Sequence, residues 1–163
     1  MGLLDRMTTL VRANINDMLD RAEDPEVMLN QILRDMEEQI GQAREQVAAM
    51  MAQETELGSD LAEAQQQALA WNDRAELAVR HQQDNLAREA LARMNDANAH
   101  VTMYQQQLET QRAFVTRLRT QLDALKSKYD NAMNNRDALI ARHRRAQAQQ
   151  QVTTAMQSGS TTD

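Results

Sequence analysis

A long apolar stripe runs along residues Leu29 to Ala78, whose sequence is LNQILRDMEEQIGQAREQVAAMMAQETELGSDLAEAQQQALAWNDRAELA. The stripe residues recur at alternating spacings of four and three, and fourteen of the fifteen are apolar. They are Leu29, Leu33, Met36, Ile40, Ala43, Val47, Met50, Glu54, Leu57, Leu61, Ala64, Ala68, Trp71, Ala75 and Ala78. A period of about 3.5 residues places one continuous seam on a helix, which is the pattern of a coiled coil. Such a helix needs a partner along its seam.

A second stripe of the same kind follows. Its residues are Ala87, Ala90, Met94, Ala97, Val101, Tyr104, Leu108, Gln111, Val115, Leu118, Leu122, Leu125, Tyr129, Ala132, Arg136, Leu139, His143 and Ala146. Between Ala78 and Ala87 a continuous helix would turn by about 100° per residue and carry the stripe to its opposite face. We therefore expect a turn near residues 81–84, with Asp84 capping the second helix. The predicted fold class is all-α, an N-terminal amphipathic helix followed by a long antiparallel coiled-coil hairpin over residues 25–147.

Folding the chain back at this turn pairs residues whose numbers sum to about 166. In this register Glu54, the charged interruption of the first stripe, lies opposite Gln111 and Arg112, where the second stripe is also polar. Two interpretations stay open, a buried polar layer that fixes the register and an ordinary solvated ion pair. Trp71 falls opposite smaller stripe residues, so we expect it to pack in the core.

Residues 2–22 predict a helix of a different kind, because their apolar residues fall within about half of a helical wheel. The residues expected to contact a membrane are Leu3, Leu4, Met7, Leu10, Val11, Ile15, Met18 and Leu19. From this pattern the segment either packs on protein or lies in a membrane interface. Asp24 and Pro25 separate it from the first arm, since Asp is a good cap and Pro suits a first helical position.

A basic cluster ends the second arm, and its residues are Arg136, Arg142, Arg144 and Arg145. The predicted register places this cluster near the acidic residues Glu23, Asp24 and Glu26. The cluster is either a solvated or paired face, or a contact for lipid phosphates or a neighbouring subunit. We expect residues 148–163 to be the start of a further helix or a flexible tail, with Ser158 to Asp163 as its linker-like end.

Composition restricts the class of protein. The chain has 163 residues with four Gly, one Pro and 2% aromatic residues, which favours an elongated helical protein over a compact domain. A net charge of −6 argues against nucleic-acid binding. The absence of cysteine excludes disulfides and thiolate chemistry. We expect no signal peptide, because charged residues follow Leu3 and Leu4 at once, and no run approaches the roughly 18 apolar residues of a transmembrane helix.

Catalytic constellations are missing from the sequence. His81 with Asp84 and His100 with Asp96 have helical spacing, but a zinc site needs three or four ligands. The sequence also lacks a Gly-rich phosphate loop. We therefore expect no metal, no cofactor and no enzymatic activity, nucleotide hydrolysis included.

Four motifs together carry a family resemblance: GLLDR at residues 2–6, RAEDPE at Arg21 to Glu26, WNDRAELA at Trp71 to Ala78 and LAREAL at Leu86 to Leu91. In their order and spacing the chain resembles the phage shock protein A and vesicle-inducing protein in plastids family over essentially its whole length. The resemblance implies a relation to ESCRT-III and a cytoplasmic protein peripheral to the inner or thylakoid membrane. It also implies polymerisation into rings or rods that bind and remodel lipid bilayers.

By this resemblance, residues 2–22 match the membrane-binding helix, the two arms match the long hairpin, and residues after Ala146 match the start of the next helix. Compared with the family's pattern, we expect the further helices to be absent from this sequence, which would make it a truncated or shortened relative. The leading hypothesis is a membrane-binding scaffold that oligomerises to maintain, repair or remodel the membrane under stress. The alternative is a regulatory protein that sequesters an AAA+ transcription activator through its hairpin.

Overall fold

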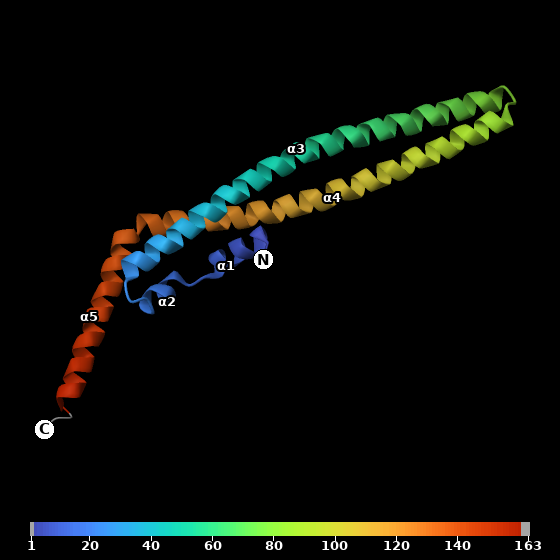
Figure 1. The fold of residues 1–163 in the computed structure, drawn as a ribbon. Helices are drawn as coiled ribbons and strands as arrows, with labels where there is room; N and C mark the ends of the chain where they lie inside the picture. Colours follow the sequence, from blue (N-terminus) through green and yellow to red (C-terminus); the bar gives the residue numbers. More distant parts are fainter. Residues whose placement is uncertain (1, 161–163) are drawn as a thin grey trace. The chain divides into compact units, whose positions relative to one another are not determined.

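The computed structural model describes residues 2–160, and within this range every regular element is an α-helix. The five helices are α1 (Leu3–Arg12), α2 (Ile15–Asp20), α3 (Pro25–Arg80), α4 (Asp84–Asn134) and α5 (Arg136–Ser160). The long helices α3 and α4 pack antiparallel as a hairpin (Figure 1). The predicted all-α fold, with its long antiparallel hairpin, is confirmed.

The turn between α3 and α4 occupies residues 81–83 and contains no glycine. Gln82 has a φ of 58°, the left-handed conformation that glycine adopts most easily. The Gln83 amide donates to the Ala78 carbonyl at 2.8 Å and the Gln82 amide donates to the Val79 carbonyl at 3.0 Å. These two bonds satisfy carbonyls at the end of α3 in the manner of a Schellman motif. The sequence predicts Asp84 as the cap of the second helix. In the structure Asp84 is instead the first residue of α4, and Gln83 is the residue before it.

The expected single helix over residues 2–22 is divided into α1 and α2, and Met1 lies outside the described residues. Ala13 is extended, with a ψ of 136°. The Asn14 side chain caps α2 by accepting a hydrogen bond from the Asp17 amide at 3.0 Å. Asn competes for backbone amides in this way, and it ends the first helix where periodicity alone would continue it.

Asp24 caps the start of α3, as the sequence predicts. Its Oδ1 accepts hydrogen bonds from the amides of Glu26 at 3.1 Å and Val27 at 3.4 Å. Pro25 occupies the first helical position, where a missing amide hydrogen costs nothing. These two residues therefore fix where the first arm starts.

The second arm is not one helix to residue 147, because α4 ends at Asn134 and α5 begins at Arg136. At the junction the Asn135 side-chain amide donates to the Asn131 carbonyl at 2.9 Å and to its Oδ1 at 2.8 Å. The chain changes direction here (Figure 1). α5 then continues to Ser160, so residues 148–160 are helical and not a flexible tail, whereas residues 161–163 lie outside the description. Ala and Gln, which are good helix formers, dominate residues 146–151.

The chain divides into two compact units, to which α3 and α4 both contribute. One unit comprises residues 2–45 and 118–160, and its fully buried residues are large: Met7, Leu19, Leu29, Met36, Leu118 and Leu125. The other comprises residues 46–117, and its seam is mostly alanine: Ala64, Ala68, Ala75, Ala78, Ala87, Ala90 and Ala97. Since apolar stabilisation scales with buried area at roughly 25 cal/mol per Å², the first unit has the stronger core per residue.

Candidate functional site: the N-terminal segment

The N-terminal segment, residues 3–22, holds the side chains predicted to meet a membrane. In the structure Met7 and Leu19 are fully buried against protein. Five others, Leu3, Leu4, Leu10, Val11 and Ile15, are half-buried. Met18 is exposed. The apolar face of the segment is therefore largely covered by other residues of the unit to which it belongs.

Lys128 of α4 holds the end of α1. Its ammonium donates hydrogen bonds to the carbonyls of Leu10 at 3.0 Å and Val11 at 2.8 Å, and also to the Ala13 carbonyl. The last carbonyls of a helix have no partner within the helix, and a cation is favourable at this end of the helix dipole. Partial burial of the ammonium lowers the pKa of Lys128 from its ordinary value. One side chain thus satisfies three acceptors where α1 stops.

His143 of α5 holds α2. Its side chain is 3% exposed, and its Nδ1 lies 2.5 Å from Oδ1 of Asp20. Its Nε2 lies 3.3 Å from Oδ1 of Asn16, one turn earlier in α2. One helical turn further along α5, Gln147 donates to the Ala22 carbonyl at 2.6 Å. The second half of the segment is therefore tied to α5 by polar contacts.

The basic cluster divides into two groups. Arg136 donates to Oδ1 of Asn30 at 2.9 and 3.1 Å and lies 3.6 Å from Oε1 of Glu26. Arg144 donates to Oε2 of the same glutamate at 2.5 Å. Arg142 and Arg145 are exposed and, among the residues described, form no ion pair. The first group holds the start of α3, and the second is free to meet anionic ligands.

Another polar contact between the two arms involves Tyr129 of α4. Burial, and then its hydrogen bond to Glu37 and the charge of that carboxylate, raise the pKa of the Tyr129 phenol above its ordinary value. Tyr129 and Glu37 belong to α4 and α3 and follow the predicted register, since their numbers sum to 166. The phenol therefore joins the arms while staying protonated at neutral pH.

The polar residues predicted to face each other across the hairpin are in contact within the unit of residues 46–117. Arg112 Nε lies 2.8 Å from Oε1 of Glu54. Gln111 donates to the Met50 carbonyl at 2.7 Å and to Oε1 of Gln53 at 3.4 Å. Since the Arg112 side chain is 61% exposed and that of Glu54 30%, this layer is partly solvated and not a buried polar core.

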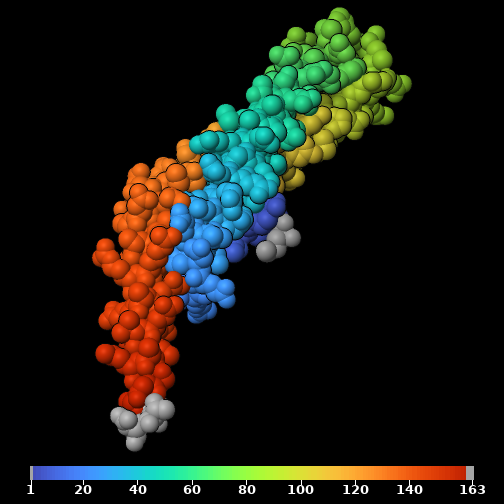
Figure 2. Space-filling model, turned by 60° about the vertical axis from the view of Figure 1, so that its left-hand side comes forward, coloured from blue at the N-terminus to red at the C-terminus, as the bar shows by residue number. Residues whose placement is uncertain are grey.

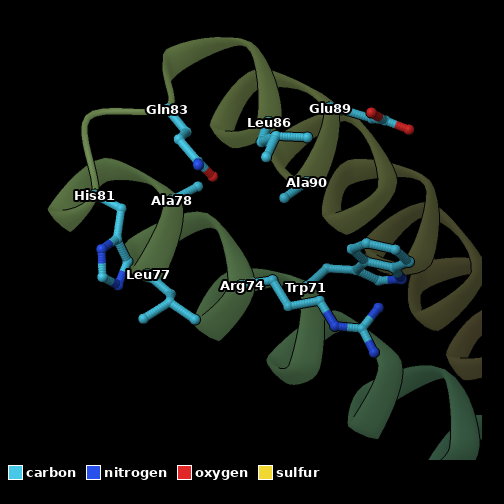
Figure 3. A pocket seen from close by; sticks show the side chains of 9 residues that line it. All are labelled: Trp71, Arg74, Leu77, Ala78, His81, Gln83, Leu86, Glu89 and Ala90. Atoms are coloured by element: carbon cyan, nitrogen blue, oxygen red, sulfur yellow. The ribbon is translucent and has the colours of Figure 1, made fainter.

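Trp71 is half-buried near the turn of the hairpin, which is less burial than the sequence predicts. The guanidinium carbons of Arg74 and Arg93 lie 4.4 and 5.1 Å from its ring centroid. Both distances permit cation–π attraction. Trp71 lines a cavity of about 380 Å³ between α3 and α4, together with Leu77 of α3 and Leu86 of α4 (Figure 3).

Three residues that hold the N-terminal segment were not singled out from the sequence: Lys128, Gln147 and, as a contact of α2, His143. His143 lies on the second stripe, and a polar residue on an apolar seam is a signal that could have drawn attention to it. Lys128 and Gln147 lie just off the stripe. Their role depends on where residues more than a hundred positions away are placed, so local pattern carries no sign of it.

Two further properties concern residues 2–160, membrane crossing and metal binding. No helix there combines the length and the apolar character needed to cross a bilayer. No group of three or more His, Cys, Asp or Glu side chains is placed there to hold a metal ion.

A comparison with protein families matches residues 2–163 to the PspA/IM30 family. The chain is 43% identical to the membrane-associated protein Vipp1 of Synechocystis sp. over 148 residues, 91% of this chain and 55% of that protein. It is 38% identical to the phage shock protein A homolog of Deinococcus radiodurans, over 91% of this chain and 66% of that protein. Protein LiaH of Bacillus subtilis is 29% identical over 93% of this chain and 68% of its own length. The chain thus spans between about half and two-thirds of these relatives, and none of their names denotes an enzyme.

Proposed function

Because the chain belongs to the PspA/IM30 family, we propose that it is a peripheral membrane protein whose N-terminal segment inserts its apolar side chains into one leaflet of a bilayer. The family's function is membrane-associated and lies in stress response or membrane maintenance, as the names of the Vipp1 and phage shock protein relatives indicate. The finer role proposed here is a scaffold that maintains, repairs or remodels the inner or thylakoid membrane from its cytoplasmic side.

The amphipathic character of the N-terminal segment is the observation that carries this proposal. α2 ends at Asp20, and residues 21–24 lie between it and α3, whose start is capped by Asp24, so the segment is not continuous with the first arm of the hairpin. Each apolar side chain contributes about 1.5 to 3 kcal/mol when fully buried in an apolar phase. The N-terminal segment carries three Asp and three Arg, whose charges cancel. Insertion of apolar groups would therefore contribute more to membrane binding than attraction to anionic headgroups.

Homo-oligomerisation into rings or rods is part of the proposal. It is supported by the far half of α5, in which every residue from 148 to 160 is exposed. On the face shown in Figure 2, no other segment lies beside these last turns. Val152 and Met156 are exposed apolar residues of this stretch, Met156 at 72%. Helices in proteins owe most of their stability to packing against other elements. Residues 148–160 lack such packing within the described chain, and a second chain would supply it.

Met18 offers the sharpest test, because it is the exposed member of the predicted lipid-contacting set and its replacement disturbs packing least. We expect Met18→Asp to lower affinity for uncharged phosphatidylcholine vesicles by at least tenfold, since the carboxylate must be desolvated on insertion. Thr9→Asp places the same charge at an exposed position of α1 and serves as the matched control. Vesicle flotation measures both. Equal loss in the two variants, or no loss in either, would contradict insertion at Met18.

The regulatory alternative, in which the hairpin sequesters an AAA+ transcription activator, is supported by the cavity beside Trp71. Leu77 and Leu86, which line it, are each more than half exposed, so an apolar partner surface would find a recess there. A pull-down without lipid tests this role. Capture of an AAA+ activator by the chain, abolished in Leu77→Asp and retained in Met18→Asp, would support it, whereas capture unaffected by Leu77→Asp would exclude this cavity.

A further inference from the structure

The apolar face of the N-terminal segment is already occupied by the protein itself. Met7 and Leu19 are fully buried, and they belong to the set that insertion into lipid would require. A side chain cannot pack on α4 or α5 and lie among acyl chains at once. Binding of this segment to a bilayer therefore competes with its docking on the hairpin.

Docking depends on polar contacts as well as on apolar burial. Lys128 closes the end of α1 with three hydrogen bonds to main-chain oxygens. His143 closes α2 by its contacts with Asp20 and Asn16. An insertion face that only packed on the hairpin would not require a partly buried lysine or a buried histidine, because both side chains lose hydration there.

The two contacts lie on opposite sides of the bend at Asn135. Lys128 belongs to α4, before the bend, and His143 belongs to α5, after it. The break between α1 and α2 at Ala13 and Asn14 faces the same region, where a cavity of about 510 Å³ is lined by Ala13, Lys128 and Asn135 among others. The N-terminal segment thus spans the bend with one half held on each helix.

We propose that Lys128 and His143 are two latches that hold the N-terminal segment in a closed state, from which it must be released before it can enter lipid. The inference rests on the proposed function, since it assumes that this segment is the one that inserts. A change in the direction of α5 relative to α4 would loosen the contact at His143 while leaving that at Lys128.

Loosening a latch raises the fraction of molecules whose segment is free. The apparent dissociation constant for vesicles equals the intrinsic constant divided by that fraction. A tenfold increase in a small open population therefore tightens binding about tenfold, and the effect ends when the segment is fully released.

Lys128→Met in the full chain removes the ammonium and keeps the length of the side chain. Hydrogen exchange measured without lipid is expected to quicken in α1, and affinity for uncharged phosphatidylcholine vesicles to rise by about three- to tenfold. Lys126→Met is the matched control, because it removes the same charge two residues away and, within residues 2–160, the hydrogen bonds from this part of α4 to the end of α1 come from Lys128 and not from Lys126. It should leave both quantities unchanged. Circular dichroism shows whether each variant keeps its helices.

Asp20→Ala tests the second latch from the exposed side of the contact, so the hairpin itself is unaltered. Exchange should quicken in α2, with tighter vesicle binding. Asp5→Ala removes the same charge from the segment without touching His143, and its α2 should exchange as in the parent chain. Unchanged exchange in both Lys128→Met and Asp20→Ala would overturn the latches.

Two further outcomes separate the latches from the proposed function. In the first, Lys128→Met and Asp20→Ala show faster hydrogen exchange but unchanged vesicle affinity, while deletion of residues 2–22 abolishes vesicle binding. This outcome would overturn the competition between docking and insertion. In the second, the chain without residues 2–22 binds vesicles as well as the full chain. This outcome would refute the proposed function, and with it the proposed competition between docking and insertion. The two failures are distinguishable because exchange is measured in the absence of lipid.

Discussion

Arg112 Nε lies 2.8 Å from Oε1 of Glu54 and joins the two arms where both apolar stripes are interrupted. The numbers of this pair sum to 166, which is the register that the sequence predicts when the chain folds back at residues 81–83. Asn30 and Arg136, in the other unit, have the same sum and are also hydrogen-bonded. Polar pairs on both arms therefore follow one register.

The contribution of the Glu54 pair to stability should be small. Both groups are partly solvated, and exposed ion pairs contribute less than about 1 kcal/mol. We expect Arg112→Ala to lower the free energy of unfolding in urea by less than about 1 kcal/mol. Arg117→Ala, an exposed arginine of the same helix, is the control. A loss of more than about 3 kcal/mol would instead mark a buried, tightly coupled pair.

Gln82→Gly should stabilise the hairpin. Gln82 adopts a left-handed conformation, which glycine takes without a steric cost. The gain should be about 0.5 to 1 kcal/mol, because the greater freedom of glycine in the unfolded chain offsets part of the relief. Urea unfolding followed by circular dichroism measures it.

Gln83→Gly is the matched control for this change, since Gln83 has no positive φ. It should be neutral or destabilising. Stabilisation of equal size in both variants would show that a general effect of glycine in the turn is at work and not the conformation of Gln82.

The hairpin and its register can be predicted from local sequence. A heptad stripe indicates both the period of a helix and the face that needs a partner, and the change of phase between the two stripes indicates where the chain folds back. The break between α1 and α2 does not follow, because Asn14 reads as one polar intrusion on an apolar arc. Its capping role depends on Ala13 becoming extended. The division at Asn135 is likewise hidden, since the second stripe continues across it through Arg136 and Leu139.

Long-range contacts of the candidate site are the other part that sequence could not supply. The apolar arc of residues 3–22 is visible in the sequence, but its docking depends on Lys128 and His143, whose partners are more than a hundred residues away. Periodicity indicates that a face needs cover and does not say what covers it. The two alternatives left open for the segment, protein and membrane, correspond to the two states between which the latches are proposed to choose.

Salt should have little effect on membrane binding. The N-terminal segment carries three Asp and three Arg, so attraction to anionic lipids adds little to apolar insertion. Between about 0.1 and 1 M salt the Debye length falls from about 10 to 3 Å, and affinity for vesicles containing phosphatidylglycerol should change by less than about threefold. A fall of tenfold or more, absent in an Arg142→Gln, Arg145→Gln double variant, would assign binding to the free arginines of α5.

The most direct test of membrane insertion by the N-terminal segment is to measure whether residue 18 enters the hydrocarbon layer. The chain has no cysteine, so Met18→Cys and Ser59→Cys each accept one environment-sensitive fluorophore, the second at an exposed position of α3. With vesicles, the label at residue 18 should shift to shorter wavelength and be quenched by brominated acyl chains, and the label at residue 59 should do neither. Vesicle-bound protein whose label at residue 18 is not quenched by brominated chains would contradict insertion of the N-terminal segment.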